Sequence, residues 1–377
     1  MYALKNCQIF TSEEILTHKF LVIKGDKIAK ILDEDDIEEL DNLFPDIQII
    51  DLEGYNIAPA LIDAQIYGGG GNLYNSKTTE ETIHNTYLEI RRAGTTHFQI
   101  TLSSTPLDKI LEAIEVAKNY LKNGGQGLAG LHIEGPFFSF PKRGAHVAAF
   151  IRKPSIEELT SIIEACKGLP TYMTVAPEEF TNEQLDLLLQ SDIKIAAGHS
   201  SATYQQAKYA FNKGIKRVTH LFNAMSAFQG REPGLVGATY DSDVWASIIP
   251  DGIHVDFTSV KISKKIMGKR LFIITDAVTN DVSGDYKFIH AGTHYTDTKG
   301  TLSGSALTML QAVKNCVEKV DIPLPEALRM ASTYPAEVLG LEHSLGKIQK
   351  DYQANFFIFD DSLQIKGLIE NGCLEWF

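Results

Sequence analysis

The segment Leu128-Ala129-Gly130-Leu131-His132-Ile133-Glu134-Gly135-Pro136 is a mostly apolar run that ends in an acidic residue and a Gly-Pro pair. Its length and bounding residues are typical of a buried β-strand that ends at the acid. Three other segments follow the same plan. Ala196-Ala197-Gly198-His199 and Val218-Thr219-His220 place a histidine after an apolar run, and Ile273-Ile274-Thr275-Asp276 places an aspartate there. The pattern predicts buried strands that carry reactive side chains at their carboxyl ends.

The wider sequence contains eight such runs, and helical patterns separate most of them. Ser155 and Glu158, for example, form the start of a capping box before an amphipathic helix. Eight strands alternating with helices predict a (β/α)8 TIM barrel, whose active site lies at the carboxyl ends of the strands. A doubly wound open sheet is the alternative, but no G-x-G-x-x-G follows the first strand to support it. The runs are Ala60–Ile66, Thr95–Leu102, Leu128–Ile133, Thr171–Ala176, Ile193–Ala197, Arg217–Thr219, Val244–Ile249 and Leu271–Thr275.

Both ends of the chain are rich in expected β-structure. Phe20–Ile23 and Lys27–Leu32 flank Gly25-Asp26, which is a hairpin signal. We therefore predict a small β-sandwich domain formed by residues 1–57 and 341–377, and a barrel domain formed by residues 58–340. In the C-terminal part, the segments expected as strands are Gly346–Ile348, Asn355–Phe359 and Gly367–Trp376.

Composition limits the possible partners. The chain has 377 residues, with 35 Lys and Arg against 48 Asp and Glu, which gives a formal net charge of −13. Nucleic acid and anionic membranes call for a basic face, so neither is expected as a partner. The four cysteines form no C-x-x-C pair, which suits a reducing compartment. We find no secretory signal and no apolar stretch of membrane-spanning length, so we expect a cytoplasmic protein.

The strand-end residues suggest metal chemistry. Glu134, His199 and His220 are ligand types that Zn²⁺ accepts, with a fourth position left for water. A bound metal makes water a usable nucleophile at neutral pH. Asp276 is then free to serve as the general base. Each residue taken alone has a structural alternative, as a cap or a satisfied buried polar group.

In addition, eight segments in order resemble those of the N-acetylglucosamine-6-phosphate deacetylases of the amidohydrolase superfamily, along nearly the whole chain. The resemblance implies that the enzyme removes acetate from the sugar amide to give glucosamine 6-phosphate. The segments are His132–Phe137, Arg143–His146, Ala197–Ser200, Thr219–Met225, Gly230–Gly234, Asp251–His254, Thr275–Ala277 and Ser303–Thr308.

The resemblance also implies a role for individual residues. Glu134, His199 and His220 would hold the metal. Asp276 would deprotonate the attacking water and protonate the leaving amine. His146 would bind the substrate near its amide carbonyl and stabilise the oxyanion. Its structural alternative is the cap of a loop.

A second group of residues is implied in binding the sugar phosphate. Asn223 and Ala224 would donate side-chain and backbone hydrogen bonds to it. Arg231 and His254 match residues that reach the substrate phosphate of the neighbouring subunit, which implies a homodimer with shared sites. The structural alternatives are a solvated surface residue for Arg231 and a helix-entry residue for His254.

The first strand departs from the superfamily pattern. Many members carry His-x-His there and bind a second metal, and one deacetylase branch has Gln-x-Asn with one metal. This chain has Gln65 and Tyr67 at the corresponding positions, and both are poor ligands for a transition metal. Strand four ends at Glu178, without the lysine that bridges two metals in other branches. We predict one divalent metal per subunit, Zn²⁺ foremost, with Fe²⁺ or another divalent metal as the alternative.

Two other functions are left open by the sequence. The galacto epimer, N-acetylgalactosamine 6-phosphate, differs at one hydroxyl that neither the metal nor Asp276 is expected to contact. A catalytically inactive amidohydrolase scaffold is the alternative from a different class, although the intact set of metal-ligand candidates speaks against it.

Overall fold

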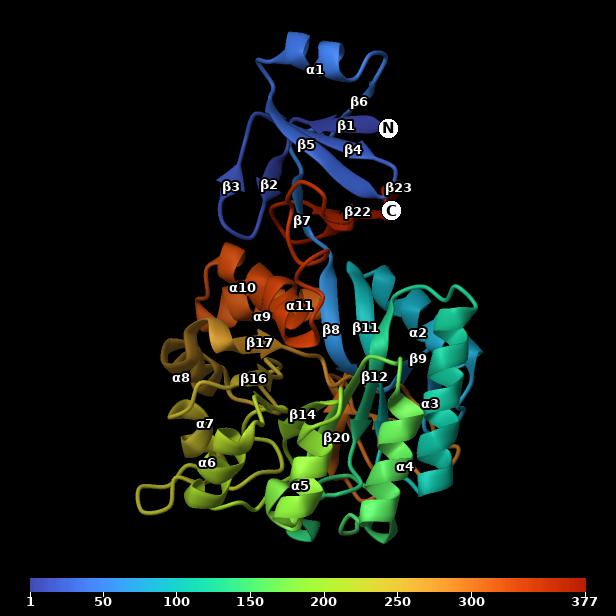
Figure 1. Cartoon of the computed structure of the whole chain (residues 1–377). Helices are drawn as coiled ribbons and strands as arrows, with labels where there is room; N and C mark the ends of the chain where they lie inside the picture. Colours follow the sequence, from blue (N-terminus) through green and yellow to red (C-terminus); the bar gives the residue numbers. More distant parts are fainter.

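The computed structural model describes all 377 residues. Its main sheet has eight parallel strands, which lie side by side in their order along the chain (Figure 1). Each strand overlaps one of the eight apolar runs, so the (β/α)8 barrel predicted from the sequence is confirmed. The strands are β8 (Leu61–Ile66), β11 (Thr95–Ser103), β12 (Leu128–Glu134), β13 (Thr171–Val175), β14 (Lys194–Ala197), β15 (Arg217–Val218), β16 (Trp245–Ile248) and β17 (Leu271–Ile273).

The barrel closes between β8 and the residues that follow β17. Ile66 and Ala277 form a parallel bridge. The backbone N–H of Tyr67 donates to the carbonyl of Ala277 at 2.9 Å, and that of Asp276 donates to the carbonyl of Gln65 at 3.0 Å. Closure therefore brings the end of the first strand directly against the end of the eighth.

Helices surround the barrel and bury one face against it. In α4, Leu159, Ile162 and Cys166 are buried. Ser155 caps this helix through the backbone N–H of Glu158, as predicted. The carboxylate of Glu158 pairs with Arg152, however, so the expected capping box is only half formed. The helices are α2 (Glu80–Arg91), α3 (Leu107–Lys122), α4 (Ile156–Cys166), α5 (Asn182–Leu189), α6 (Tyr204–Lys213), α7 (Gly234–Tyr240), α8 (Phe257–Met267), α9 (Met309–Val320), α10 (Leu324–Ala331) and α11 (Thr333–Leu339).

The two ends of the chain meet in a small β-structure beside the barrel, where both termini lie (Figure 1). Its two sheets share a core that includes Ile9, Leu21, Ile57 and Phe356. The boundaries 1–57, 58–340 and 341–377 stay predictions. One sheet has the order β5 (Lys27–Asp33), β4 (Lys19–Lys24), β1 (Tyr2–Lys5) and β6 (Gln48–Asp51), and the other has the order β23 (Cys373–Trp376), β22 (Ile365–Glu370), β21 (Phe356–Phe359), β7 (Asn56–Pro59), β2 (Gln8–Phe10) and β3 (Ile15–Leu16). A short helix, α1 (Ile37–Leu43), connects β5 to β6.

Two predictions about the C-terminal strands were wrong. Gly346–Ile348 is not a strand. Gly346 has φ +80°, which is not an extended conformation, and a Cβ at this position would lie only 3.0 Å from the carbonyl oxygen of Ser332 and the Cα of Thr333. The segment Gly367–Trp376 is not one strand but the greater part of a hairpin, in which β22 and β23 turn at Asn371 and Gly372.

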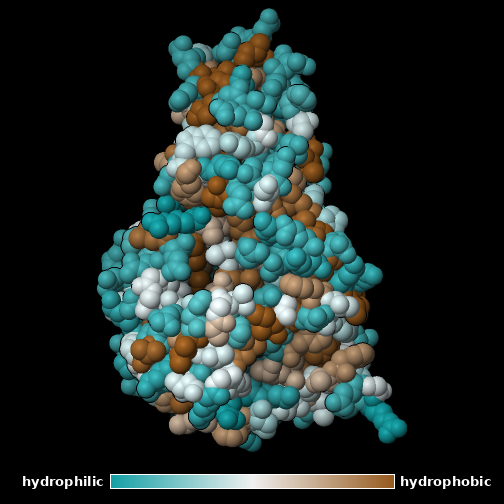
Figure 2. Space-filling model, turned by 180° about the vertical axis from the view of Figure 1, so that it is seen from behind, coloured by the Kyte–Doolittle hydropathy of each residue, from teal (hydrophilic) through white to brown (hydrophobic).

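A long segment after β17 covers part of the barrel mouth. It contains the antiparallel strands β18 (Ile289–His290), β19 (His294–Thr296) and β20 (Leu302–Ser305). A second, short hairpin of β9 (Gly68–Gly69) and β10 (Asn72–Leu73) follows the first barrel strand. No helix combines the length and the hydrophobicity needed to cross a membrane. Hydrophilic side chains dominate the face seen in Figure 2, and the apolar ones form separate small patches.

Candidate metal and substrate site

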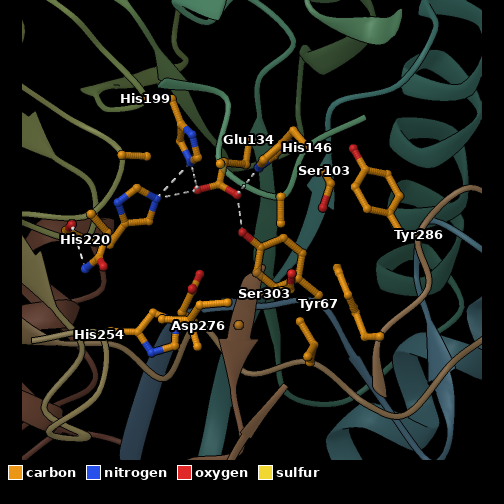
Figure 3. Close-up of a pocket in the computed structure, with 18 residues that line it drawn as sticks. Tyr67, Ser103, Glu134, His146, His199, His220, His254, Asp276, Tyr286 and Ser303 are labelled. Carbon is orange, nitrogen blue, oxygen red and sulfur yellow. Dashed lines mark hydrogen bonds and ion pairs between the residues drawn. The ribbon is translucent and has the colours of Figure 1, made fainter. Parts of the chain in front are cut away.

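Three of the strand-end side chains converge on one point (Figure 3). The Oε1 atom of Glu134 lies 3.0 Å from Nε2 of His220 and 3.4 Å from Nε2 of His199. The two Nε2 atoms are 3.1 Å apart. Tetrahedral Zn²⁺ with bonds of about 2.0–2.2 Å holds its donors about 3.3–3.5 Å from one another, so the spacing of these atoms fits such an ion.

The backbone at the strand ends turns these side chains into the barrel mouth. His199 has φ +48°, His220 has φ +34° and Asp276 has φ +53°. Non-glycine residues rarely adopt this left-handed region, and each costs on the order of 1 kcal/mol or more. The fold retains this strain at three of its four strand-end candidates, as is common at functional sites.

A hydrogen bond fixes the tautomer of His199. Its Nδ1 lies 2.8 Å from the carbonyl of Lys142. A carbonyl only accepts, so Nδ1 carries the proton and Nε2 keeps a free lone pair, as in most histidine ligands of metals. Phe138 stacks on the ring at 4.1 Å and fixes its plane.

The charge state of the cluster also suits a cation. Burial alone would raise the pKa of Glu134, but the neighbouring rings of His146, His199 and His220 lower it well below its usual range. Burial opposes protonation of His199 and lowers its pKa to about 4. The cluster therefore presents an ionised carboxylate beside a neutral imidazole. Nδ1 of His220 is buried without a partner, while its Nε2 faces Oε1 of Glu134 at 3.0 Å, and this carboxylate raises the pKa of His220 against the effect of burial.

His146 lies beside the cluster and was a candidate for substrate binding. One atom each from Glu134, His146 and His199 lie within 4.8 Å of one another, so distance alone would admit His146 as a ligand. Its Nδ1, however, accepts the backbone N–H of Ser104 at 3.1 Å. The proton of the neutral ring is therefore on Nε2, which faces Oε2 of Glu134 at 3.2 Å. A protonated nitrogen donates a hydrogen bond and cannot ligate, so His146 is better suited to hold a substrate oxygen.

Asp276 lies across the mouth from the histidines, beside Gln65. Nε2 of Gln65 lies 2.6 Å from Oδ1 of Asp276, 2.9 Å from Oε1 of Glu134 and 2.9 Å from the hydroxyl of Tyr67. The Tyr67 hydroxyl in turn bonds Oε2 of Glu134. Burial, together with the charge of Glu134, raises the pKa of Asp276. Burial also raises the pKa of Tyr67, which keeps the phenol protonated.

A cavity of about 220 Å³ opens above the cluster. Asn223, Ala224 and His254 line it, as expected of substrate-binding residues. The amide of Asn223 is turned toward the carbonyls of His220 and Leu221, while the backbone N–H of Ala224 has no acceptor within the chain. His146 and Asp276 line the same cavity.

His254 lines the pocket of its own chain, and its reach toward a neighbouring subunit stays a prediction. Asp251 accepts its backbone N–H at 2.7 Å and its Nδ1 at 2.6 Å, which holds the ring inward. Arg231 lies apart from these residues, in an exposed loop outside the pocket of its own chain.

Sequence reasoning missed several residues of this site. Tyr67 was noted only as a departure from the family pattern, yet it bonds Glu134. Phe138 follows the Gly135-Pro136 turn and had no signal of its own. Tyr286 and Ser303 come from the segment after β17 and form the opposite wall. Only Ser303 had a sequence signal, because it begins one of the family-like segments.

The donor set fits a divalent metal. One carboxylate oxygen and two imidazole nitrogens lie at ligand spacing, and one of the imidazoles has its lone pair free by virtue of its other hydrogen bond. Such a set on the carboxyl ends of a TIM barrel, with an unliganded carboxylate opposite, defines the class of metal-dependent hydrolases.

Comparison with known proteins places the chain within this class. A model described as "Amidohydrolase family" matches residues 56–373, and one described as "NagA composite domain" matches residues 1–57. The chain belongs to the amidohydrolase family.

Its relatives are named as deacetylases of two N-acetylated sugar phosphates. An N-acetylglucosamine-6-phosphate deacetylase of Haemophilus influenzae is 36% identical over 98% of each chain. The structure of such an enzyme from Pasteurella multocida has a TM-score of 0.93 at 35% identity and covers all of both chains. A mutant of the Mycobacterium smegmatis enzyme, solved with N-acetyl-D-glucosamine-6-phosphate, has a TM-score of 0.88 at 26% identity, covering 100% of this chain and 98% of that one. An N-acetylgalactosamine-6-phosphate deacetylase of Shewanella is 32% identical over 82% of this chain and 80% of its own.

Proposed function

We propose that this protein hydrolyses the acetamide of N-acetylglucosamine 6-phosphate to glucosamine 6-phosphate and acetate. The observation that carries the proposal is the convergence of Glu134, His199 and His220 opposite Asp276 at one barrel mouth. The relatives named for this reaction, which match along almost the whole chain, support the choice of substrate.

Glu134, His199 and His220 would hold one divalent metal, with Zn²⁺ as our first choice. Such an ion polarises the amide carbonyl and lowers the pKa of water. The protein's own groups do the remaining work. Asp276 accepts the proton of the attacking water and returns it to the nitrogen of the leaving amine. Gln65 holds Oδ1 of Asp276 in place during both transfers.

His146 supplies a hydrogen bond for the reacting carbonyl. Its Nε2–H faces the metal cluster, and Ser104 fixes the ring from the other side. A preorganised donor of this kind stabilises the negative charge that develops on the carbonyl oxygen. When substrate binds, its carbonyl oxygen would replace Oε2 of Glu134 as the acceptor of the hydrogen bond from Nε2–H of His146.

The phosphate end of the substrate needs donors away from the metal. Asn223 and the free backbone N–H of Ala224 lie along that wall of the pocket, together with His254. The proton of His254 lies on Nδ1, toward Asp251, so Nε2 would accept a hydrogen bond from a sugar hydroxyl and would not donate to the phosphate.

We further propose a homodimer in which Arg231 contacts the partner's substrate. Arg231 is exposed on the loop that also carries Phe228, whose side chain is 61% exposed. Phe228 packs on Tyr240, which bonds Ser263 of α8, and Ile262 and Ile266 of that helix are also exposed. An arginine beside an exposed apolar patch is suited to a protein interface. The expected compartment is the cytoplasm, which agrees with four unpaired cysteines.

The decisive experiment compares three substrates on the purified protein: N-acetylglucosamine 6-phosphate, its galacto epimer and unphosphorylated N-acetylglucosamine. We expect the highest kcat/KM for the first and a large loss without the phosphate. A higher kcat/KM for the galacto epimer would identify the protein as an N-acetylgalactosamine-6-phosphate deacetylase. No turnover of any of the three substrates would favour a catalytically inactive scaffold.

A further inference from the structure

Tyr67 is not one of the candidate metal ligands, although its phenol lies beside them and contacts Glu134 (Figure 3). The residue directly follows β8, and its backbone is held on both sides. Its N–H donates to Ala277 at 2.9 Å, and its carbonyl accepts the N–H of Tyr74 at 2.8 Å. The side chain is only 6% exposed. The phenol therefore occupies a position that the barrel closure defines.

The direction of its hydrogen bonds follows from the partners. Nε2 of Gln65 can only donate, and its two protons face three acceptors: the phenol oxygen at 2.9 Å, Oε1 of Glu134 at 2.9 Å and Oδ1 of Asp276 at 2.6 Å. The ionised carboxylate of Glu134 can only accept, so the phenol O–H donates its hydrogen bond to Oε2. The hydrogen bond from the Tyr67 hydroxyl to Glu134 therefore has a fixed direction, whichever two acceptors the Gln65 amide serves.

The two oxygens of Glu134 consequently have different surroundings. Oε2 accepts from Tyr67 and from Nε2 of His146, at 3.2 Å in the latter case. Oε1 faces both ligand histidines, His199 and His220, and lies 2.9 Å from the side-chain amide of Gln65. Oε2 is thus held by two donors on the side away from the histidines, and Oε1 is the oxygen placed to bind a cation together with them.

We propose that Tyr67 is a positioning residue, which fixes Glu134 as a single-oxygen ligand by holding Oε2 away from the metal. This inference rests on the metal centre of the proposed function. Partners that orient metal ligands in this way typically change metal affinity by about 10–100-fold when they are removed. Without the phenol proton, Oε2 would be free to bind the same ion and change its coordination number.

The test uses Tyr67→Phe, which removes one hydroxyl and keeps the ring. Tyr74→Phe is the matched control, because Tyr74 is also buried but donates to the carbonyl of Ala113, in α3. Both full-length variants and the wild type are stripped of metal and titrated with Zn²⁺ against a chelating indicator. Each protein is then loaded with Co²⁺, and its visible absorption spectrum is recorded.

We expect Tyr67→Phe to bind Zn²⁺ about 10-fold or more weakly. We also expect its Co²⁺ bands to weaken and shift as the coordination number rises. Tyr74→Phe should match the wild type in both measurements, even where its thermal stability falls. An affinity and spectrum of Tyr67→Phe equal to those of the wild type would overturn the inference. Failure of the wild type to bind metal would instead overturn the proposed function.

A crystal structure of the zinc-loaded wild type tests the same point without a variant, should Tyr67→Phe not fold. We expect Oε1 of Glu134 on the ion and Oε2 on the hydroxyl of Tyr67. Both carboxylate oxygens on the metal, or a phenol out of contact with Glu134, would contradict the proposal.

Discussion

The side-chain amide of Gln65 lies 2.6 Å from the carboxylate of Asp276, and the backbone N–H of Asp276 returns a hydrogen bond to the carbonyl of Gln65 at 3.0 Å. The first and eighth strands of the barrel thus meet through the side chain proposed as the general base. The contact that closes the barrel also orients the catalytic carboxylate, so the stability of the barrel seam and the geometry of the reaction are coupled.

Asp276→Asn should keep the fold and the metal but lower kcat by about 10²–10⁴-fold, because the amide cannot accept the proton of water. Deacetylation of N-acetylglucosamine 6-phosphate gives the rate, and metal analysis of the same sample gives the occupancy. Near-normal turnover with full metal content would show that another group is the base.

Much of this architecture follows from local sequence. Strands of a parallel barrel are buried on both faces, so they stand out as apolar runs, and the residue after each run is placed at the mouth by the topology alone. Glu134, His199, His220 and Asp276 could be assigned in this way. Contacts between side chains on different strands could not be predicted from local sequence. The bond from Tyr67 to Glu134 joins residues 67 positions apart, and the inward turn of His254 depends on the local loop around Asp251.

The variant His146→Gln tests whether His146 binds the substrate or binds the metal. The tautomer set by Ser104 makes Nε2 a donor, so this variant should retain the metal while kcat falls by about 10²–10³-fold, the usual cost of losing an oxyanion donor. Metal content and kcat are measured together. Loss of the metal in proportion to the loss of activity would assign His146 to the ligand set, which the interatomic distances alone would permit.

Metal analysis of the purified protein should give one divalent ion per chain, because Gln65 and Tyr67 stand where a second ion would need ligands. Removal of that ion by a chelator should abolish activity and lower the thermal midpoint. At a free metal concentration of 100 times Kd, the stabilisation amounts to about 2.7 kcal/mol. Two tightly held ions per chain would contradict the one-metal site.

Asp63 gives a prediction about pH and stability. Burial raises its pKa to about 6 from 3.8, against the opposing hydrogen bonds from Thr275 and Gln65. The pKa of Asp63 is higher in the folded than in the unfolded protein. The protonated side chain therefore makes its whole contribution to the free energy of unfolding below about pH 3.8, and this contribution is lost as the pH rises through about 6. Ionisation of Asp63 in the folded protein therefore costs about 3 kcal/mol at neutral pH.

Asp63→Asn should remove this cost. Urea unfolding of metal-free wild type and variant at several pH values between 4 and 7.5 measures the difference in free energy of unfolding. We expect that difference to move in favour of the variant as the pH rises, and to level off above about pH 7. A difference that stays constant with pH would mean that Asp63 ionises in the folded protein without penalty.

Mixed dimers test whether Arg231 serves the neighbouring subunit. Arg231→Ala should raise KM for the phosphorylated substrate by about 10-fold or more, as expected when one charge-assisted hydrogen bond to the phosphate is lost. When Arg231→Ala is mixed and reassembled with Asp276→Asn, the mixed dimer has one site with an intact Asp276 and an intact Arg231 from the other subunit. Activity at low substrate should then exceed that of either variant alone. If Arg231→Ala leaves KM for the phosphorylated substrate unchanged, positively charged residues of the same chain must bind the phosphate. Arg143, Lys287 and Lys299, which line an adjoining hollow, would be the next residues to substitute.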